Sequence, residues 1–218
     1  MKRTSKAKKS TLTVNKRILI LCEGKTECGY FTAFKKDPDL KASLSAVDVD
    51  AYQPTDFSPL GLIDEAKRRK KEAHQKKNPF NSIWIVFDRD GHHGVSEAFQ
   101  SAIDTKINKA FSSVCFEFWI ILHFEFTTRS FKNGDEVVSY LKSRHYPLYK
   151  KGQNFYINLK PRIDTAIKHA KKICDKAHED IEDGHTKLCD YNPYTNIHEL
   201  VLELQGKAGS KKQKALAL

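Results

Sequence analysis

Four acidic residues directly follow two short apolar segments of the sequence, and they are the side chains best suited to do chemistry. They are Glu23, Glu27, Asp88 and Asp90. The segments before them, residues 17–22 and 82–87, have the length and apolar content typical of buried strands in a parallel sheet. Ligands bind such sheets beyond the carboxyl ends of the strands. We therefore expect the four carboxylates to gather at one edge of a sheet.

Four carboxylates in one place repel one another and do not all stay ionised unless cations lie between them. Mg²⁺ or Mn²⁺ prefers such oxygen ligands, and two of these ions about 4 Å apart clamp the attacking and leaving oxygens in phosphoryl transfer. The sequence therefore predicts a divalent-metal site. Its predicted metal ligands are Glu23, Glu27, Asp88 and Asp90, and its predicted catalytic residues are Glu23, Asp88, Asp90 and Lys25.

Three further side chains are candidates for supporting this site. Arg89 lies between the two aspartates and, like Lys25, could offset charge on a scissile phosphate. His92 either binds metal or phosphate or is solvated in a glycine-flanked turn together with His93. Glu117 lies in an apolar stretch and is either paired in a salt bridge or directed at the metal edge, because burying an unpaired carboxylate is costly.

A nucleotide-binding P-loop is excluded, although residues 24–26 read Gly-Lys-Thr. That motif needs a glycine five residues before its second glycine, and Leu19 occupies that position, in the middle of the predicted strand.

The net charge of +11 resides at the two ends of the chain. Residues 1–17 hold seven basic residues and residues 206–218 hold four, without an acid, so residues 18–205 carry 27 of each sign. Such tails either attract nucleic acid or aid solubility. One predicted helix also has a strongly basic face, which is either solvated or a track for phosphates. Its residues are Lys67, Arg68, Arg69, Lys70 and Lys71.

The composition is that of a soluble globular protein of 218 residues, with 39% hydrophobic and 30% charged residues. The longest apolar run, residues 118–122, is far shorter than the roughly 20 residues that span a bilayer, so we expect no membrane association. Five cysteines without a CxxC pair argue against a disulfide framework and a zinc ribbon, and they indicate a reducing, cytoplasmic location.

Hydrophobic periodicity predicts strands alternating with helices in the first part of the chain and mainly helices in the second. Strands are expected over residues 17–22, 44–52, 82–87 and 109–112. Helices are expected over residues 27–36, with Thr26 as the cap, and over 60–77, 95–109, 115–126, 135–146, 162–180 and 195–204. Residues 150–159 are expected to form an extended connection.

This order predicts an α/β fold, in which a Rossmann-like core with a mainly parallel four-stranded sheet is flanked by helices and followed by a helical C-terminal part. The predicted division is a basic tail (1–16), a core (17–126), a helical extension packed on the core (127–205) and a second basic tail (206–218).

Four segments together resemble the RloB-like proteins, whose core is a TOPRIM domain, the metal-binding fold shared by topoisomerases, bacterial primases and OLD nucleases. They read ILILCEGKTE, IWIVFDRD, CFEFWIILHFE and NPYTNIHELV, and they spread from residue 18 to about 204. The resemblance implies that Glu23, Asp88 and Asp90 carry the metal, joined by Glu27 as in OLD-type nucleases. One departure is residues 112–117, which read SSVCFE where the family usually has Ser-Asn-Pro-x-Phe-Glu.

The resemblance also implies a function, because genes of this family occur in prokaryotic defence loci beside an ABC-class ATPase. It implies a Mg²⁺- or Mn²⁺-dependent endonuclease that acts on DNA or RNA, tRNA included, as an effector of antiphage defence or abortive infection. The chain has no room for the nucleophilic-tyrosine domain of a topoisomerase. The competing hypothesis is a non-catalytic subunit that binds nucleic acid or the ATPase, in which the acids hold a structural ion.

Overall fold

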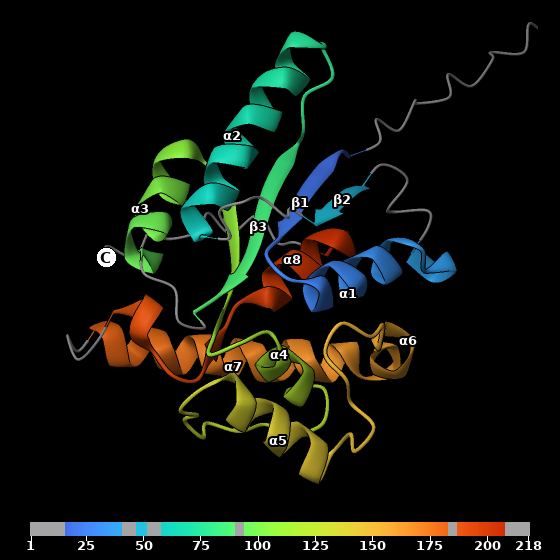
Figure 1. Cartoon of the computed structure of the whole chain (residues 1–218), viewed down its shortest axis with the longest axis vertical. Helices are drawn as coiled ribbons and strands as arrows, with labels where there is room; N and C mark the ends of the chain where they lie inside the picture. Colours follow the sequence, from blue (N-terminus) through green and yellow to red (C-terminus); the bar gives the residue numbers. More distant parts are fainter. Residues whose placement is uncertain (1–15, 41–46, 52–57, 90–93, 183–186, 208–218) are drawn as a thin grey trace, which may run out of the picture.

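The computed structural model describes residues 16–40, 47–51, 58–89, 94–182 and 187–207. Asp90, His92, His93 and almost all of both basic tails lie outside the described residues. The described chain forms one open sheet with helices on both faces and further helices at its lower edge in the view of Figure 1.

Five strands form the sheet in the described part of the chain, in the order β2-β1-β3-β4-β5. The first four run parallel, and β5 pairs antiparallel with β4. This confirms the predicted mainly parallel sheet of four strands, to which β5 adds two residues. The strands are β1 (Ile18–Cys22), β2 (Val47–Ala51), β3 (Ser82–Asp88), β4 (Asn108–Ser113) and β5 (Tyr194–Thr195).

The order of the strands reverses at β1. From β1 the chain crosses through α1 (Lys25–Lys35) to β2 on one side, and it then returns through α2 (Pro59–Gln75) to β3 on the other side. It continues outwards through α3 (Val95–Thr105) to β4. In open α/β sheets the ligand crevice lies beyond the carboxyl ends of the strands at such a reversal. Here that position lies between the ends of β1 and β3, next to Glu23 and Asp88.

Helices cover both faces of the sheet. α2 and α3 pack together on one face, and α1 and α8 (Ile197–Leu204) cover the other (Figure 1). The predicted inner side of α1 is confirmed, since Tyr30, Phe31 and Phe34 are buried. In α3, by contrast, the predicted inner residue Ile103 is 38% exposed, because the helix buries Ala98, Phe99 and Ala102 and then ends at Thr105.

The C-terminal part is helical, as predicted, and the carboxyl ends of β1 and β3 are directed towards it (Figure 1). The long helix α7 buries the predicted side, from Ile163 to Cys174. The remaining elements are α4 (Glu117–Ile121), α5 (Gly134–Arg144), α6 (Tyr156–Leu159), α7 (Ile163–Glu182) and the 3₁₀ turns Pro38–Leu40, Lys160–Arg162 and Leu188–Asp190.

Two predictions of local structure were wrong. The helix expected over residues 115–126 is reduced to the five residues of α4, although most of the segment is buried. A stretch that is apolar on all sides shows no helical periodicity. Its apolar composition therefore predicts burial but does not distinguish a helix from other conformations. The connection expected over residues 150–159 ends in α6, where the Tyr156 N–H donates to Asn154 Oδ1 at 3.1 Å.

None of the helices in the described ranges combines the length and the apolar character that crossing a bilayer requires.

Candidate functional site

Glu23 and Asp88 meet where β1 and β3 end. The parallel register pairs Cys22 with Val86, and the Glu23 N–H donates to the Val86 carbonyl at 3.0 Å. The Asp88 N–H in turn donates to Glu23 Oε2 at 3.2 Å. The two acid-tipped segments, 65 residues apart in the sequence, are therefore direct neighbours at the carboxyl edge of the sheet.

Glu27 belongs to the same edge, although it lies in the first turn of α1 and is only 5% exposed. Its carboxylate folds back onto Gly24, where a Cβ would collide with Glu27 Oε2, so only glycine leaves room for this conformation. Burial, followed by the negative charges of Asp88 and Glu117, raises the pKa of Glu27 to about 8. Glu27 thus keeps its proton at neutral pH unless a cation comes close.

Glu117 is the fourth acid of this group. It begins α4, is 2% exposed and accepts a hydrogen bond of 2.5 Å from the Tyr149 hydroxyl. Its charge contributes to the raised pKa of Glu27, which places it beside the metal edge that was one of its two predicted positions. Among the described residues, no Lys, Arg or His forms a salt bridge with Glu117, and its hydrogen-bond donor is the neutral phenol of Tyr149. Burial and the charges of Glu117 and Asp88 also raise the pKa of Cys115, which disfavours a reactive thiolate.

Carboxylates are suitable ligands for a divalent cation, but the side chains are not arranged around a single cation position. Within the described ranges, no three His, Cys, Asp or Glu side chains already converge on a point where a cation could sit. Carboxylate oxygens are nevertheless the donors that Mg²⁺ and Mn²⁺ prefer, and the pKa of Glu27 is raised by burial first and by the negative charges of Asp88 and Glu117 second, both of which a bound cation would offset. Asp90, the remaining predicted ligand, lies outside the described residues.

A loop from the C-terminal part, residues 149–152, reaches this edge and was missed by the sequence reasoning. Besides the bond from Tyr149 to Glu117, the Gly152 N–H donates to Thr26 Oγ1 at 3.1 Å, and the charge of Lys151 lowers the pKa of Glu27. Thr26 was predicted to cap α1, but Gly24 holds that position and the threonine hydroxyl receives the loop instead. No local signal in the sequence indicates this contact, which spans 126 residues.

A family model for RloB-like proteins matches residues 18–204. The chain belongs to the RloB-like family. The match begins at the first residue of β1 and ends at the last residue of α8, so it takes in the sheet, the acids and the C-terminal helices together. No curated protein matches the chain.

The two predicted cations of this RloB-like protein lie apart from each other. Lys25 begins α1 and is exposed close to Gly152 of the C-terminal loop. Arg89 follows β3, where its N–H donates to the Ser112 carbonyl at 3.3 Å and its Nη1 donates to the Asp190 carbonyl at 3.0 Å. Lys25 thus begins the helix that carries Glu27, whereas the guanidinium of Arg89 is held towards the 3₁₀ turn Leu188–Asp190.

Three of the five cations on the predicted basic face of α2, Lys67, Arg68 and Arg69, pair with acids of the same helix. Lys67 lies 3.1 Å from Asp64, and Lys70 donates to the Thr105 carbonyl at 3.0 Å. Arg68 and Arg69 both bind the buried carboxylate of Glu65, whose pKa lies below its usual range chiefly because of Arg68. Such pairs could have been anticipated, because these acids lie three or four residues from the cations.

Proposed function

We propose that this RloB-like protein is a Mg²⁺- or Mn²⁺-dependent nuclease of the TOPRIM type that hydrolyses phosphodiester bonds in DNA or RNA. The observation that carries the proposal is the gathering of four carboxylates from β1, α1, β3 and α4 at the point where the strand order reverses. Two of these acids, Glu27 and Glu117, are buried, which is costly for a carboxylate without a cation. Metal-dependent phosphoryl transfer uses such a group of acids to hold its ions. A role as an effector in antiphage defence or abortive infection, alongside an ABC-class ATPase, rests on the family alone.

The four acids would share the work of holding the ions. Glu23 and Asp88 lie at the strand ends and would bind first, Glu27 would join on losing its proton, and Glu117 would be kept in place by Tyr149. Bound Mg²⁺ or Mn²⁺ would supply a Lewis acid and an activated water. Lys25, exposed at the start of the helix that carries Glu27, would approach a substrate phosphate, and Asp90 would complete the ligand set.

The test is cleavage of labelled single-stranded and duplex DNA, RNA and tRNA by the parent and by Asp88→Asn, with Mg²⁺ and with Mn²⁺. We expect the variant to lose about 10²-fold or more in rate, the loss typical when one preorganised electrostatic group is removed. Asp164→Asn changes an acid on α7 whose side chain is 87% exposed and serves as the matched control. If Asp88→Asn cleaves like the parent while its circular dichroism spectrum is unchanged, the assignment of the site is wrong.

The second candidate is a non-catalytic subunit in which the acids hold a structural ion. It is favoured by the lack, among the described residues, of three side chains that already converge on one cation position. It predicts that Mn²⁺ raises the melting temperature of the parent but that no nucleic acid is cleaved, alone or with an added ABC-class ATPase. Metal-dependent cleavage by the purified protein would exclude it.

A further inference from the structure

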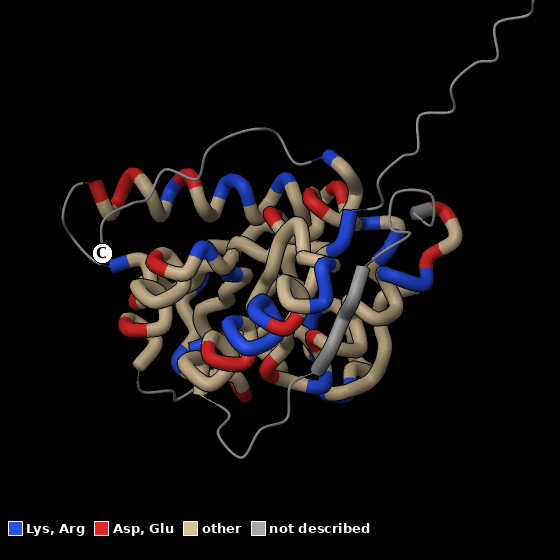
Figure 2. Tube along the Cα trace, turned by 90° about the horizontal axis from the view of Figure 1, so that it is seen from above, with Lys and Arg blue, Asp and Glu red and all other residues tan. Residues whose placement is uncertain are grey.

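Positive charge exceeds negative charge in two stretches of the folded body, residues 67–77 and residues 123–172. Residues 18–205 carry equal numbers of acids and bases, yet residues 123–172 contain eleven Lys and Arg against four Asp and Glu. This stretch therefore has a net charge of +7, balanced by −7 in the rest of the body. It runs from the end of α4 through α5 and α6 into α7, and all of it is described. Figure 2 shows the same division along α7, whose acidic residues gather towards its C-terminal end.

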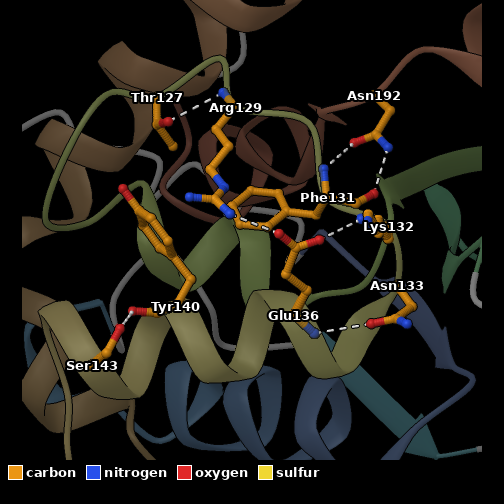
Figure 3. A network of polar contacts seen from close by, with 9 residues as sticks. All are labelled: Thr127, Arg129, Phe131, Lys132, Asn133, Glu136, Tyr140, Ser143 and Asn192. Carbon is orange, nitrogen blue, oxygen red and sulfur yellow. Dashed lines mark hydrogen bonds and ion pairs between the residues drawn. The ribbon is translucent and has the colours of Figure 1, made fainter.

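Several of these cations lie against aromatic rings. The Arg129 guanidinium lies 5.6 Å from the centre of the Phe131 ring and 5.3 Å from that of Tyr140 (Figure 3). The Arg144 guanidinium lies 5.3 Å from the centre of the same Tyr140 ring. Glu136 forms an ion pair of 2.7 Å with Arg129. The ring of Tyr140 therefore lies next to two exposed guanidinium groups.

A second group of the same kind continues the surface along residues 122–126. Arg162 lies 5.3 Å from the Phe124 ring, on which His145 stacks with the ring planes 7° apart. Phe126 is 44% exposed, and its ring has Lys172 at 5.4 Å. The rings of His145 and Tyr140, 6.3 Å apart, join this group to the first.

These cations differ from those of α2 in their partners. In α2, Lys67, Arg68 and Arg69 pair with the carboxylates of Asp64, Glu65 and Glu72. Among the described residues, no ion pair within 4.0 Å joins Arg144, Arg162 or Lys172 to a carboxylate, and all three are exposed. The charges of these three residues therefore remain available to a ligand, whereas Arg129 is paired with Glu136.

The chain that forms this surface also connects to the acids at the end of the sheet. Downstream of α5, the chain passes directly into Tyr149, which holds Glu117, and into Gly152, which binds Thr26 at the start of α1. In Figure 1, α5 and α7 lie on the side of the sheet towards which the carboxyl ends of β1 and β3 are directed.

We propose that this aromatic–basic surface binds single-stranded nucleic acid. It consists of Phe126, Arg129, Tyr140, Arg144, Arg162 and Lys172. The cations would neutralise phosphates, and the exposed ring of Phe126 and the partly exposed ring of Tyr140 would offer planar faces to unpaired bases, a combination typical of single-strand binding. An acidic protein would use the cations but leave the ring faces unoccupied. The further idea that the bound nucleic acid reaches the acids rests on the proposed nuclease function, whereas the binding itself does not.

The test is fluorescence anisotropy with labelled DNA and RNA single strands of about 15 nucleotides and the corresponding duplexes, in EDTA and between about 50 and 200 mM salt. The variant combines Arg144→Ala, Arg162→Ala and Lys172→Ala. The control combines Lys67→Ala, Lys71→Ala and Lys76→Ala on α2, which removes the same charge. Phe126→Leu tests stacking separately, because leucine keeps the apolar character without the ring.

We expect the triple variant to bind single strands about tenfold more weakly or worse, with the slope of log Kd against log salt reduced by about two, since each lost phosphate contact on a single strand contributes about 0.7. The α2 control should change Kd less than about twofold, and Phe126→Leu should weaken single-strand binding about fivefold. Melting temperatures of all variants should match that of the parent, because the substituted side chains are exposed.

The proposal is overturned if the α2 control loses as much affinity as the triple variant, or if Phe126→Leu binds like the parent. It is also overturned if no nucleic acid binds at low salt, and binding of polyglutamate instead would indicate an acidic protein partner. Since EDTA prevents metal-dependent cleavage, normal binding without cleavage in Mn²⁺ would contradict the nuclease and leave this surface intact.

Discussion

Replacing Glu27 with glutamine should stabilise the metal-free protein, and by an amount that depends on pH. The pKa of Glu27 is raised from 4.5 to about 8 in the folded state, so folding takes up a proton between these values. The free energy of unfolding therefore falls as the pH rises through this window. At pH 5 the carboxyl is protonated in most folded molecules and the cost is small, whereas above pH 8 it is ionised in both states and the full cost is present.

The size of the effect follows from the same pKa. A change from 4.5 to about 8 corresponds to about 5 kcal/mol above pH 8 and about 3 kcal/mol at pH 7, because one pKa unit is about 1.4 kcal/mol. Glu27 is 5% exposed, so solvent screens little of this cost. Glutamine keeps the shape and removes the charge. At about 2–4 °C per kcal/mol, Glu27→Gln should melt roughly 6–12 °C above the parent at pH 7 in EDTA.

The assay is thermal unfolding of the parent and of Glu27→Gln at pH 5, 7 and 8, in EDTA and with Mn²⁺. The difference in melting temperature should grow with pH in EDTA. With Mn²⁺ it should shrink or reverse, because a bound cation stabilises the ionised carboxylate of Glu27 in the parent. Glu179→Gln, at an exposed position of α7, should show no such trend. A melting-temperature difference that stays constant from pH 5 to pH 8 would refute the raised pKa of Glu27 in the folded protein.

Three further substitutions test contacts around the site. Tyr149→Phe removes the donor to buried Glu117 and should lower the free energy of unfolding by about 1.5–3 kcal/mol, measured by urea denaturation, while weakening Mn²⁺ binding in calorimetry. Gly24→Ala places a Cβ against the Glu27 carboxylate, so it should reduce Mn²⁺ affinity with little change in circular dichroism; unchanged affinity would show that Glu27 does not bind metal. Asn196→Ala removes the acceptor of the buried Phe111 N–H in β4 and should cost about 1–3 kcal/mol in the same denaturation assay, and a smaller loss would imply that water replaces the amide.

The parts of the site that the sequence could predict are those that depend on neighbouring residues. Glu23 and Asp88 end apolar strands, and parallel pairing alone brings such ends to one edge. The orientation of Glu117 was left open between two alternatives, because it depends on Tyr149, 32 residues away. The ion pairs of Glu65 with Arg68 and Arg69 in α2 could have been predicted, since Glu65 precedes these residues by three and four positions.

The aromatic–basic surface shows a different limit of sequence reading. The positive net charge of this surface is visible in the composition of residues 123–172. It does not appear in the net charge of residues 18–205, which is zero. The ring contacts of Arg129 and Lys172 join the segment after α4 to α5 and to α7. Packing of separate elements decides these contacts, whereas Arg144 and Tyr140 lie four residues apart in α5, so helical spacing predicts their contact.

The contacts that cross residue 126 explain why the sheet and the C-terminal part should act as one unit. Without Tyr149, the buried carboxylate of Glu117 would lose its hydrogen-bond donor, a loss more costly than that of an exposed pair. Without α8, Ser82 and Trp84 of β3 would lose the Glu203 carboxylate, which accepts from them at 2.7 and 2.8 Å. The strand that carries Asp88 is thus anchored at its other end by the last helix. A fragment that ends at residue 126 would keep the acids in its sequence, but it would lose the groups that hold β3 and Glu117 in position.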